Sequence, residues 1–468
     1  MKQTGITTFA LAMLITGAVN NIRNLPSAAL FGTSLIFFFI FSAIFFLIPT
    51  ALVSAELASG QAEKNGIYHW VKAAFGEKLG FLSIWLQWVT NLVWFPTALS
   101  FVAGVTAYLM DPALAQNKFY LIGTMLGAFW IVTLINLKGI DLSARIVSIC
   151  TVIGLVLPLI LMMSLAAVWF FSGQPLHIQL THATLLPNLR HLDGWTSLTA
   201  IMTGLAGIEL AAVHARDVKN PQKTFPRALH LSVWIILTTM IVGSLAIAMV
   251  LPREQINLVN GALQAFASFF KAYHIEKWIP VITVMILIGS FGSMISWVIS
   301  PARGLLQAAQ SGYLPLFLRK ENKHGVAANL LLTQAAIVTV VCFAFLFMPS
   351  VSSSYWLLTA LSTQLYMLMY VLLFLSALRL RYKISLQSRA FKIPGGKWGM
   401  GLVCLFGLIG CIITLIVGFF PPQGLDLGQA FSYRMIFGSG MVVMTLPILF
   451  FYAYKYITSE AALGGEAA

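Results

Sequence analysis

An apolar run near the N-terminus is interrupted by the stretch Thr16-Gly17-Ala18-Val19-Asn20-Asn21-Ile22-Arg23-Asn24-Leu25-Pro26. A second apolar run, in the other half of the chain, is interrupted by Thr203-Gly204-Leu205-Ala206-Gly207-Ile208-Glu209. Ionisable groups are costly inside a bilayer and therefore mark candidate sites. Gly/Pro-interrupted segments at corresponding positions in two halves of a chain point to the binding site of a transporter. The two stretches together predict a protein that carries a small solute across a membrane.

The composition supports a membrane protein. Of the 468 residues, 59% are hydrophobic and only 9% are charged, which excludes a soluble globular protein. Apolar runs long enough to cross about 30 Å of hydrocarbon recur along the chain, and backbone polar groups in lipid must be bonded within helices. We therefore predict an all-α polytopic membrane protein with twelve transmembrane helices, at about 7–32, 35–57, 80–109, 118–137, 144–172, 196–215, 228–251, 278–302, 327–347, 354–378, 399–420 and 430–456.

The basic residues are distributed unequally between the loops. Of the 28 Lys and Arg residues, 19 lie in the loops after spans two, four, six, eight and ten. The positive-inside rule therefore predicts that these loops and both termini face the cytoplasm, with the chain in the inner membrane. The net charge of +14 reflects this unequal distribution, and most of the basic residues are spread over five short loops. We therefore expect a lipid bilayer as partner and no nucleic acid.

The first interruption suits a substrate with two opposite charges. A helix that ends near Ala18 and restarts near Arg23 or Asn24 leaves free carbonyls facing free amides. The amides and the restarting dipole suit a carboxylate, whereas the carbonyls suit an ammonium group or a cation. An amino acid offers both groups. The alternative is a kink at glycine and asparagine that binds no ligand.

The two charged residues each have more than one interpretation. Arg23 can face the cavity and hold a carboxylate, extend to the outer interface, or pair with Glu209. Glu209 can bind an ammonium group or a proton, or form a hydrogen bond between helices. Glu56, near the end of span two, is expected to be interfacial or structural.

Polar stripes mark three further spans. They are Gln87, Thr90, Asn91 and Trp94 in span three, Ser293, Ser296 and Ser300 in span eight, and Thr359, Thr363, Tyr366 and Tyr370 in span ten. Such stripes either line a cavity or hold helices together. The chain has no P-loop, Rossmann fingerprint or HExxH motif, so we expect no enzyme, no cofactor and no metal site.

Short motifs along the chain match those of a known family in order and spacing. They are Ala55-Glu56-Leu57-Ala58, Asn65-Gly66-Ile67-Tyr68-His69-Trp70, Gly207-Ile208-Glu209, Asn220-Pro221, Ser296-Trp297, Pro301-Ala302-Arg303-Gly304 and Ile393-Pro394-Gly395-Gly396-Lys397. With them, the chain resembles the amino acid–polyamine–organocation superfamily of permeases, and within it the bacterial glutamate:GABA antiporter family. The superfamily's first-helix pattern, Gly-Ser-Gly-Ile-Phe and a following Pro, falls on Val19-Asn20-Asn21-Ile22-Arg23 and Pro26.

The resemblance implies a LeuT-type fold in a single domain, 1–468. It implies inverted five-helix repeats at about 7–172 and 196–378, and two extra helices at about 399–456. It also implies alternating access around a central site between discontinuous helices one and six, lined by helices three, eight and ten. By position, the substrate would meet Val19, Asn20, Asn21, Ile22, Thr203, Gly204, Leu205 and Ala206. Because Val19 and Asn21 replace the family's glycines and Arg23 its phenylalanine, the family's substrates are not simply inherited.

We therefore expect an amino acid antiporter that exchanges acidic or neutral amino acids and their decarboxylated amines. Arg23 is expected to bind a substrate carboxylate, and Glu209 an ammonium group or a proton. Gln87, Asn91, Ser293, Ser296 and Thr363 complete the expected site. The resemblance also implies that some proton-coupled relatives have a lysine in span five; span five of this chain has none, which favours exchange over proton symport. The alternatives are a proton-coupled symporter and, because a soluble signalling domain is lacking, less readily an amino acid sensor.

Overall fold

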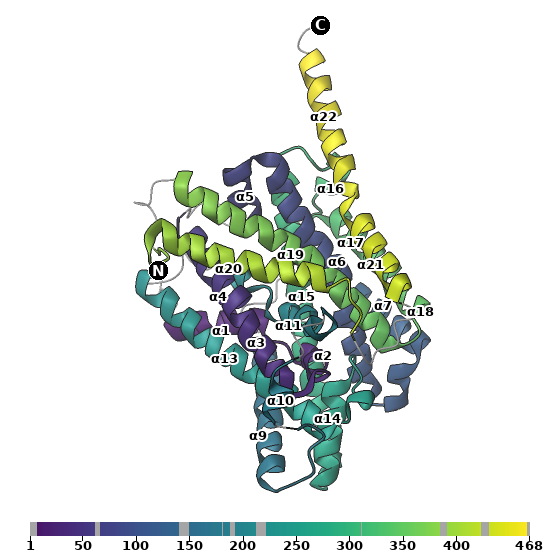
Figure 1. Ribbon diagram of the computed structural model, residues 1–468. Helices are drawn as coiled ribbons and strands as arrows, with labels where there is room; N and C mark the ends of the chain where they lie inside the picture. The colour runs from purple at the N-terminus through teal and green to yellow at the C-terminus, as the bar shows by residue number, and fades with distance from the viewer. Residues whose placement is uncertain are drawn as a thin grey trace.

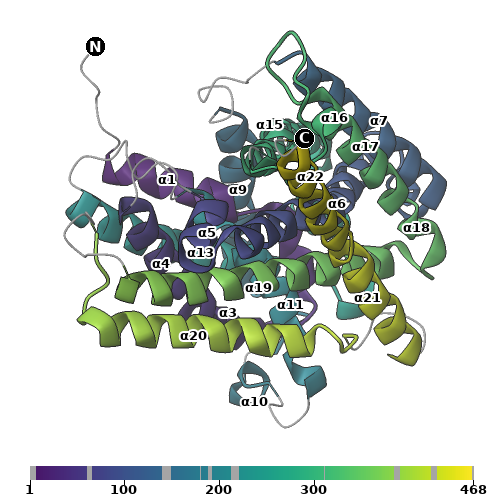
Figure 2. The same cartoon turned by 90° about the horizontal axis from the view of Figure 1, so that it is seen from above.

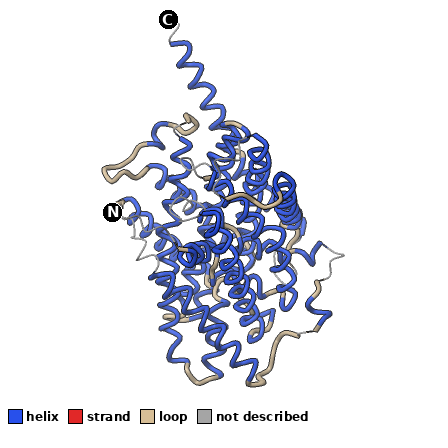
Figure 3. Tube along the Cα trace, turned by 90° about the vertical axis from the view of Figure 1, so that its left-hand side faces the viewer, coloured by secondary structure: helices blue, strands red, loops and turns tan. Residues whose placement is uncertain are grey.

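The computed structural model is a bundle of helices (Figure 1). It describes residues 7–60, 66–139, 149–179, 181–187, 192–211, 221–309, 311–383, 391–422 and 430–465. Within these ranges the secondary structure consists of helices, turns and loops, and no strand is present (Figure 3). The predicted all-α fold class is therefore confirmed.

The helices follow one another along the whole chain. They are α1 (Thr8–Val19), α2 (Leu25–Ala29), α3 (Leu35–Ser42), α4 (Ile48–Gly60), α5 (Ile67–Phe75), α6 (Glu77–Ala107), α7 (Lys118–Leu137), α9 (Leu157–Phe171), α10 (His182–Leu185), α11 (Ser197–Leu205), α12 (Ile208–Ala211), α13 (Pro221–Val250), α14 (Gly261–Ala272), α15 (Ile279–Ala309), α16 (Leu316–Arg319), α17 (Ala328–Cys342), α18 (Ala344–Phe347), α19 (Val351–Lys383), α20 (Gly396–Val417), α21 (Ala430–Thr445) and α22 (Pro447–Gly465). Two π-helical segments, Ala43–Leu47 and Val152–Val156, continue into α4 and α9.

Ten helical stretches of the described chain are long and apolar enough to cross a membrane. They fall in ten of the twelve predicted segments. The two segments without a continuous stretch are 7–32 and 196–215, because each is divided into shorter helices at its interruption. The total of twelve spans and the inverted repeats stay predictions.

Both helix interruptions lie where the sequence predicts them. The helix α1 ends at Val19, and a 3₁₀ turn, Ile22–Asn24, leads into α2. The helix α11 ends at Leu205, and Ala206 has an extended backbone before α12 begins. Between them Gly207 has a φ of 106°, a conformation that a residue with a Cβ rarely adopts. Glycine at this position therefore allows the chain to turn into α12.

Two long helices form the interior of the bundle. The apolar windows of α6 and α19 are 89% and 83% buried within the protein, against 11% for the stretch Ser432–Thr458 in α21 and α22. Figures 1 and 2 show α20 lying along α19, while α22 extends beyond the rest of the bundle. The polar stripes of α6 and α19 therefore face other helices rather than lipid.

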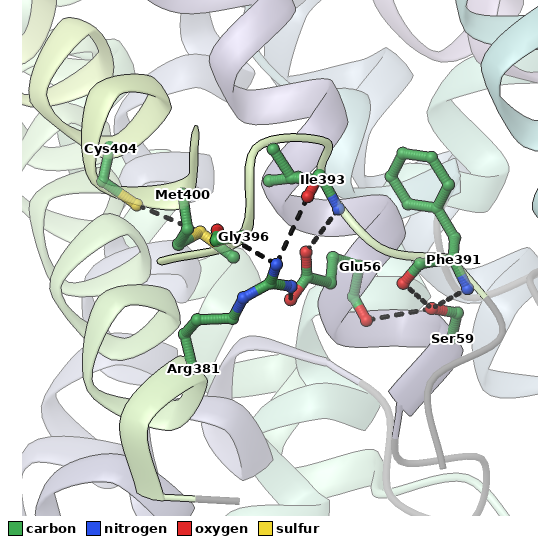
Figure 4. A network of polar contacts seen from close by, with 8 residues as sticks. All are labelled: Glu56, Ser59, Arg381, Phe391, Ile393, Gly396, Met400 and Cys404. Atoms are coloured by element: carbon green, nitrogen blue, oxygen red, sulfur yellow. Dashed lines mark hydrogen bonds and ion pairs between the residues drawn. The ribbon is translucent and has the colours of Figure 1, made fainter. Parts of the chain in front are cut away.

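A buried ion pair holds the end of α19 against α4 (Figure 4). The side chains of Glu56 and Arg381 are 0% and 2% exposed, and Arg381 Nη1 donates to Glu56 Oε1 over 2.5 Å. Arg381 Nη2 also donates to the Gly396 carbonyl over 3.0 Å, and the Ile393 amide donates to Glu56 Oε2 over 2.7 Å. Glu56 therefore has a structural place in the protein interior rather than an interfacial one.

We expect Glu56→Gln to lower the thermal stability of the purified protein strongly. The substitution leaves the Arg381 charge buried without its counter-charge, which costs about 3–5 kcal/mol. Thermal unfolding in detergent measures the effect. The control is Glu77→Gln, because Glu77 is 40% exposed and its pairs with Lys72 and Lys455 are each worth about 1 kcal/mol or less. Equal losses of stability in the two variants would contradict a structural role specific to the buried pair.

Candidate functional site

A cavity of about 110 Å³ lies between the two helix interruptions. Its walls come from both breaks and from α6, α15, α19 and the start of the π-helical segment before α9. Ten of the fifteen predicted site residues line it: Val19, Asn20, Asn21, Ile22, Arg23, Asn91, Thr203, Ala206, Ser293 and Thr363. The three polar stripes therefore converge on the breaks.

Four predicted residues lie outside the lining of the cavity. Gly204 packs against Met240 and Asn24 on another side of α11, and Leu205 is fully buried in the core. Gln87 is buried one helical turn before Asn91, whose side-chain amide donates to the Gln87 carbonyl. Glu209 is the fourth. The side chain of Ser296, the fifteenth predicted residue, lies outside the described part of the structure.

Arg23 is a buried cation in the cavity wall. It is 3% exposed, and its Nε and Nη1 atoms have no hydrogen-bond partner. Its guanidinium carbon lies 4.5 Å from the ring centroid of Trp94, within the range of a cation–π interaction. The Trp94 ring lies 5.4 Å from that of Trp297. Among the described residues no carboxylate pairs with Arg23, and its guanidinium lies against an aromatic face.

Glu209 is bonded to α19 instead of to Arg23. Tyr366 donates to Oε1 and Tyr370 to Oε2, each over 2.5 Å. Tyr366 lines the cavity, whereas Glu209 does not, so one phenol separates the carboxylate from the cavity. Of the alternatives that the sequence left open for Glu209, these contacts correspond to a hydrogen bond between helices, and Glu209 does not pair with Arg23.

The backbone amides at the two restarts are already bonded to side chains. Asn21 Oδ1 accepts from the Arg23 amide over 2.9 Å, which caps the 3₁₀ turn. At the other break the Gly207 amide donates to the Tyr370 hydroxyl over 2.8 Å. These two amides are therefore not available to a substrate carboxylate, which differs from the expectation of free amides at the restarts. The Nε and Nη1 atoms of the Arg23 guanidinium, by contrast, are donors without a partner.

Comparison with known proteins gives the family. The sequence profile of the amino acid permease family matches residues 6–442. The chain belongs to the amino acid permease family. This confirms the resemblance drawn from the motifs. The protein is thus a multi-pass membrane transporter and not an enzyme.

The permease is similar to several transporters over nearly its whole length. It is 41% identical over 443 residues to an uncharacterized transporter of Legionella pneumophila, covering 94% of this chain and 95% of the relative. It is 30% identical over 451 residues to a glutamate/gamma-aminobutyrate antiporter of Lactococcus lactis, covering 95% and 90%. A probable agmatine/putrescine antiporter of the same species is 23% identical, with 85% and 84% covered.

The fold of the permease also occurs in a solved structure. The manganese transporter of Eremococcus coleocola, in a crystal structure of a variant, superposes with a TM-score of 0.59 at 14% identity, covering 96% of this chain and 94% of that one. At this identity the likeness concerns the fold alone.

Sequence reasoning missed part of the site. Trp94 and Tyr366 stand in predicted polar stripes, but the stacking on Arg23 and the bond to Glu209 depend on side-chain directions that spacing does not give. The wall formed by Thr151 and Gly154 had no signal, because the π-helical segment that follows Thr151 reads as an ordinary apolar run.

We expect Ala206→Cys, in a permease whose four native cysteines are replaced by alanine, to react with a small thiol reagent. Ala206 lines the cavity, whereas its neighbour Leu205 is fully buried. Leu205→Cys is therefore the matched control and should stay unmodified under the same conditions. Mass spectrometry of the intact protein measures the labelling. Equal labelling of both positions would mean that the cavity does not have the walls described.

Proposed function

We propose that the permease is an amino acid antiporter that works by alternating access. Its substrates are acidic or neutral amino acids and those of their decarboxylation products that keep a carboxylate. The observation that carries the proposal is the buried, unpaired guanidinium of Arg23 in a cavity between two broken helices. In this proposal the permease lies in a bacterial inner membrane with both termini in the cytoplasm, on the basis of the distribution of Lys and Arg.

A substrate carboxylate is the natural partner of Arg23. Burying a cation without a counter-ion costs several kcal/mol, and a carboxylate that binds it in the cavity recovers much of that free energy. A planar guanidinium can donate two parallel hydrogen bonds to one carboxylate. Because the amides of Arg23 and Gly207 are bonded within the chain, the guanidinium is the donor that supports carboxylate binding.

The same cation favours exchange over one-way transport. When the cavity is occupied by a carboxylate, the charge of Arg23 is neutralised during the conformational change. When the cavity is empty, the permease must rearrange around an unpaired buried charge, which is less favourable. The permease with a bound substrate therefore undergoes the conformational change of alternating access more readily than the empty permease. The antiporters among the relatives support this proposal.

The charge of the cavity wall supports anionic or zwitterionic substrates. Arg23 is the charged residue of the described lining, and no Asp or Glu is among the lining residues. A ligand that carries only positive charge finds no counter-charge there. We therefore do not assign agmatine or putrescine exchange to this permease.

The second candidate is proton-coupled uptake. The observation that favours it is a carboxylate, Glu209, that is 3% exposed and linked through Tyr366 to the cavity. In that case protons would be partners of the permease, and Glu209→Gln would remove the response of uptake to a proton gradient.

Counterflow into liposomes tests the proposal. Purified permease in vesicles preloaded with a pool of amino acids and amines is expected to take up labelled amino acid much faster than in empty vesicles. Uptake into empty vesicles that needs a proton gradient would instead identify a symporter. Binding without uptake under either condition would identify a sensor and contradict the transport proposal.

We expect Arg23→Gln to weaken substrate binding on the order of 10-fold or more, because a hydrogen-bonded charge pair is lost. The ratio of uptake into preloaded and empty vesicles should also fall toward one. Arg23→Lys is the matched control: it keeps the charge, and therefore the dependence on preloading, but loses the planar fork. Unchanged affinity in Arg23→Gln for every transported substrate would show that Arg23 does not bind the carboxylate.

A further inference from the structure

Asn20, at the first helix break, has one satisfied and one unsatisfied side-chain atom. It lines the cavity and is 6% exposed. Its Nδ2 atom donates to the hydroxyl of Thr239, on α13, over 2.7 Å. Its Oδ1 atom is buried and has no hydrogen-bond partner. A buried acceptor without a hydrogen bond costs free energy. Because this acceptor belongs to a residue of the cavity wall, a donor group of a bound ligand is a suitable partner for it.

The orientation of the Asn20 amide follows from the hydrogen bonds of Thr239. A threonine hydroxyl has one proton to donate, and Thr239 gives it to the carbonyl of Ile235, over 2.7 Å. The Thr239 oxygen can then only accept. If the amide of Asn20 turned over, its oxygen would face another oxygen that has no proton to offer. With the Thr239 proton bonded to a carbonyl of α13, Asn20 presents its NH₂ group to Thr239, which leaves Oδ1 for a ligand.

We propose that Thr239 is a positioning residue that orients Asn20, so that Asn20 Oδ1 accepts a hydrogen bond from the ammonium group of the substrate. The proposal rests on the proposed amino acid exchange and adds the recognition of the second charge. Thr239 is not among the residues that line the cavity, so its effect passes through Asn20.

Arg23 and Asn20 bind different groups of an amino acid. The guanidinium of Arg23 has only donors, and the free atom of Asn20 is only an acceptor. A carboxylate is attracted to Arg23 and repelled by Asn20 Oδ1, whereas an ammonium group has the opposite preferences. The cavity therefore selects substrates that carry both groups, above dicarboxylates of the same length and above simple amines.

Thr203 and Thr363 also line the cavity, but their hydroxyls have hydrogen-bond partners within the protein, unlike Asn20 Oδ1. The hydroxyls of Thr203 and Thr363 donate to carbonyls of their own helices and contact each other. Asn21 uses its side-chain oxygen to cap the 3₁₀ turn.

The test compares Thr239→Val with Thr239→Ser in the counterflow assay. Valine keeps the branched shape but removes the hydroxyl, whereas serine keeps the hydroxyl. For labelled glutamate we expect the KM of Thr239→Val to rise about 10-fold with little change in Vmax, because the Asn20 amide loses its fixed orientation. Thr239→Ser should stay within about twofold of the unsubstituted permease.

Glutarate, which is glutamate without its amino group, gives the readout that separates positioning from a merely structural effect. Its inhibition constant against labelled glutamate should be the same in the unsubstituted permease and in Thr239→Val. Asn20→Ala should weaken glutamate but not glutarate, and adding Thr239→Val to Asn20→Ala should weaken glutamate no further.

The outcomes separate this inference from the proposed function. If the unsubstituted permease exchanges neither glutamate nor another amino acid, the proposed function fails. If it exchanges glutamate and Thr239→Val leaves the KM unchanged, this inference alone is overturned. It is equally overturned if glutarate loses as much affinity as glutamate in Thr239→Val, or if the two substitutions act additively.

Discussion

The central constraint on the structure is a buried positive charge that no carboxylate of the described residues neutralises. The guanidinium of Arg23 lies in the protein interior against the face of Trp94. A cation–π contact is worth about 2 kcal/mol when desolvated, which is less than the cost of removing a cation from water. The helix break that brings Arg23 to the cavity adds to this cost. The remaining free energy is available to a ligand of opposite charge, and this links the fold to transport.

Many other buried polar and charged groups of the bundle have partners within the protein. Several other polar groups near the breaks are bonded by side chains of the chain itself: Asn21 caps the 3₁₀ turn, and Tyr370 bonds both Glu209 and the Gly207 amide. On α19, away from the cavity, Arg381 pairs with Glu56 through Nη1 and donates to two carbonyls through Nη2. The two buried arginines therefore differ in one respect: the structure supplies a carboxylate to Arg381 and none to Arg23.

Local patterns predicted the breaks, the long spans and most of the cavity wall. Glycine, asparagine and proline inside apolar runs are local signals, and so is the spacing of Asn91, Ser293 and Thr363 on their helices. These patterns do not give the rotation of a short helix about its axis, and this rotation decides whether a side chain reaches the cavity. Glu209 lies two residues beyond Gly207, and α12 turns it toward the tyrosines of α19. The role of Thr239 had no signal in the sequence, because a threonine in an apolar helix usually bonds its own backbone.

An experimental structure of the permease with an exchanged amino acid in the cavity would test the role of Arg23 directly. We expect the substrate carboxylate within about 2.7–3.2 Å of the Arg23 guanidinium nitrogens, with the ammonium group toward Asn20 Oδ1. A substrate whose carboxylate is bound elsewhere, while Arg23 still stacks unpaired on Trp94, would contradict this role.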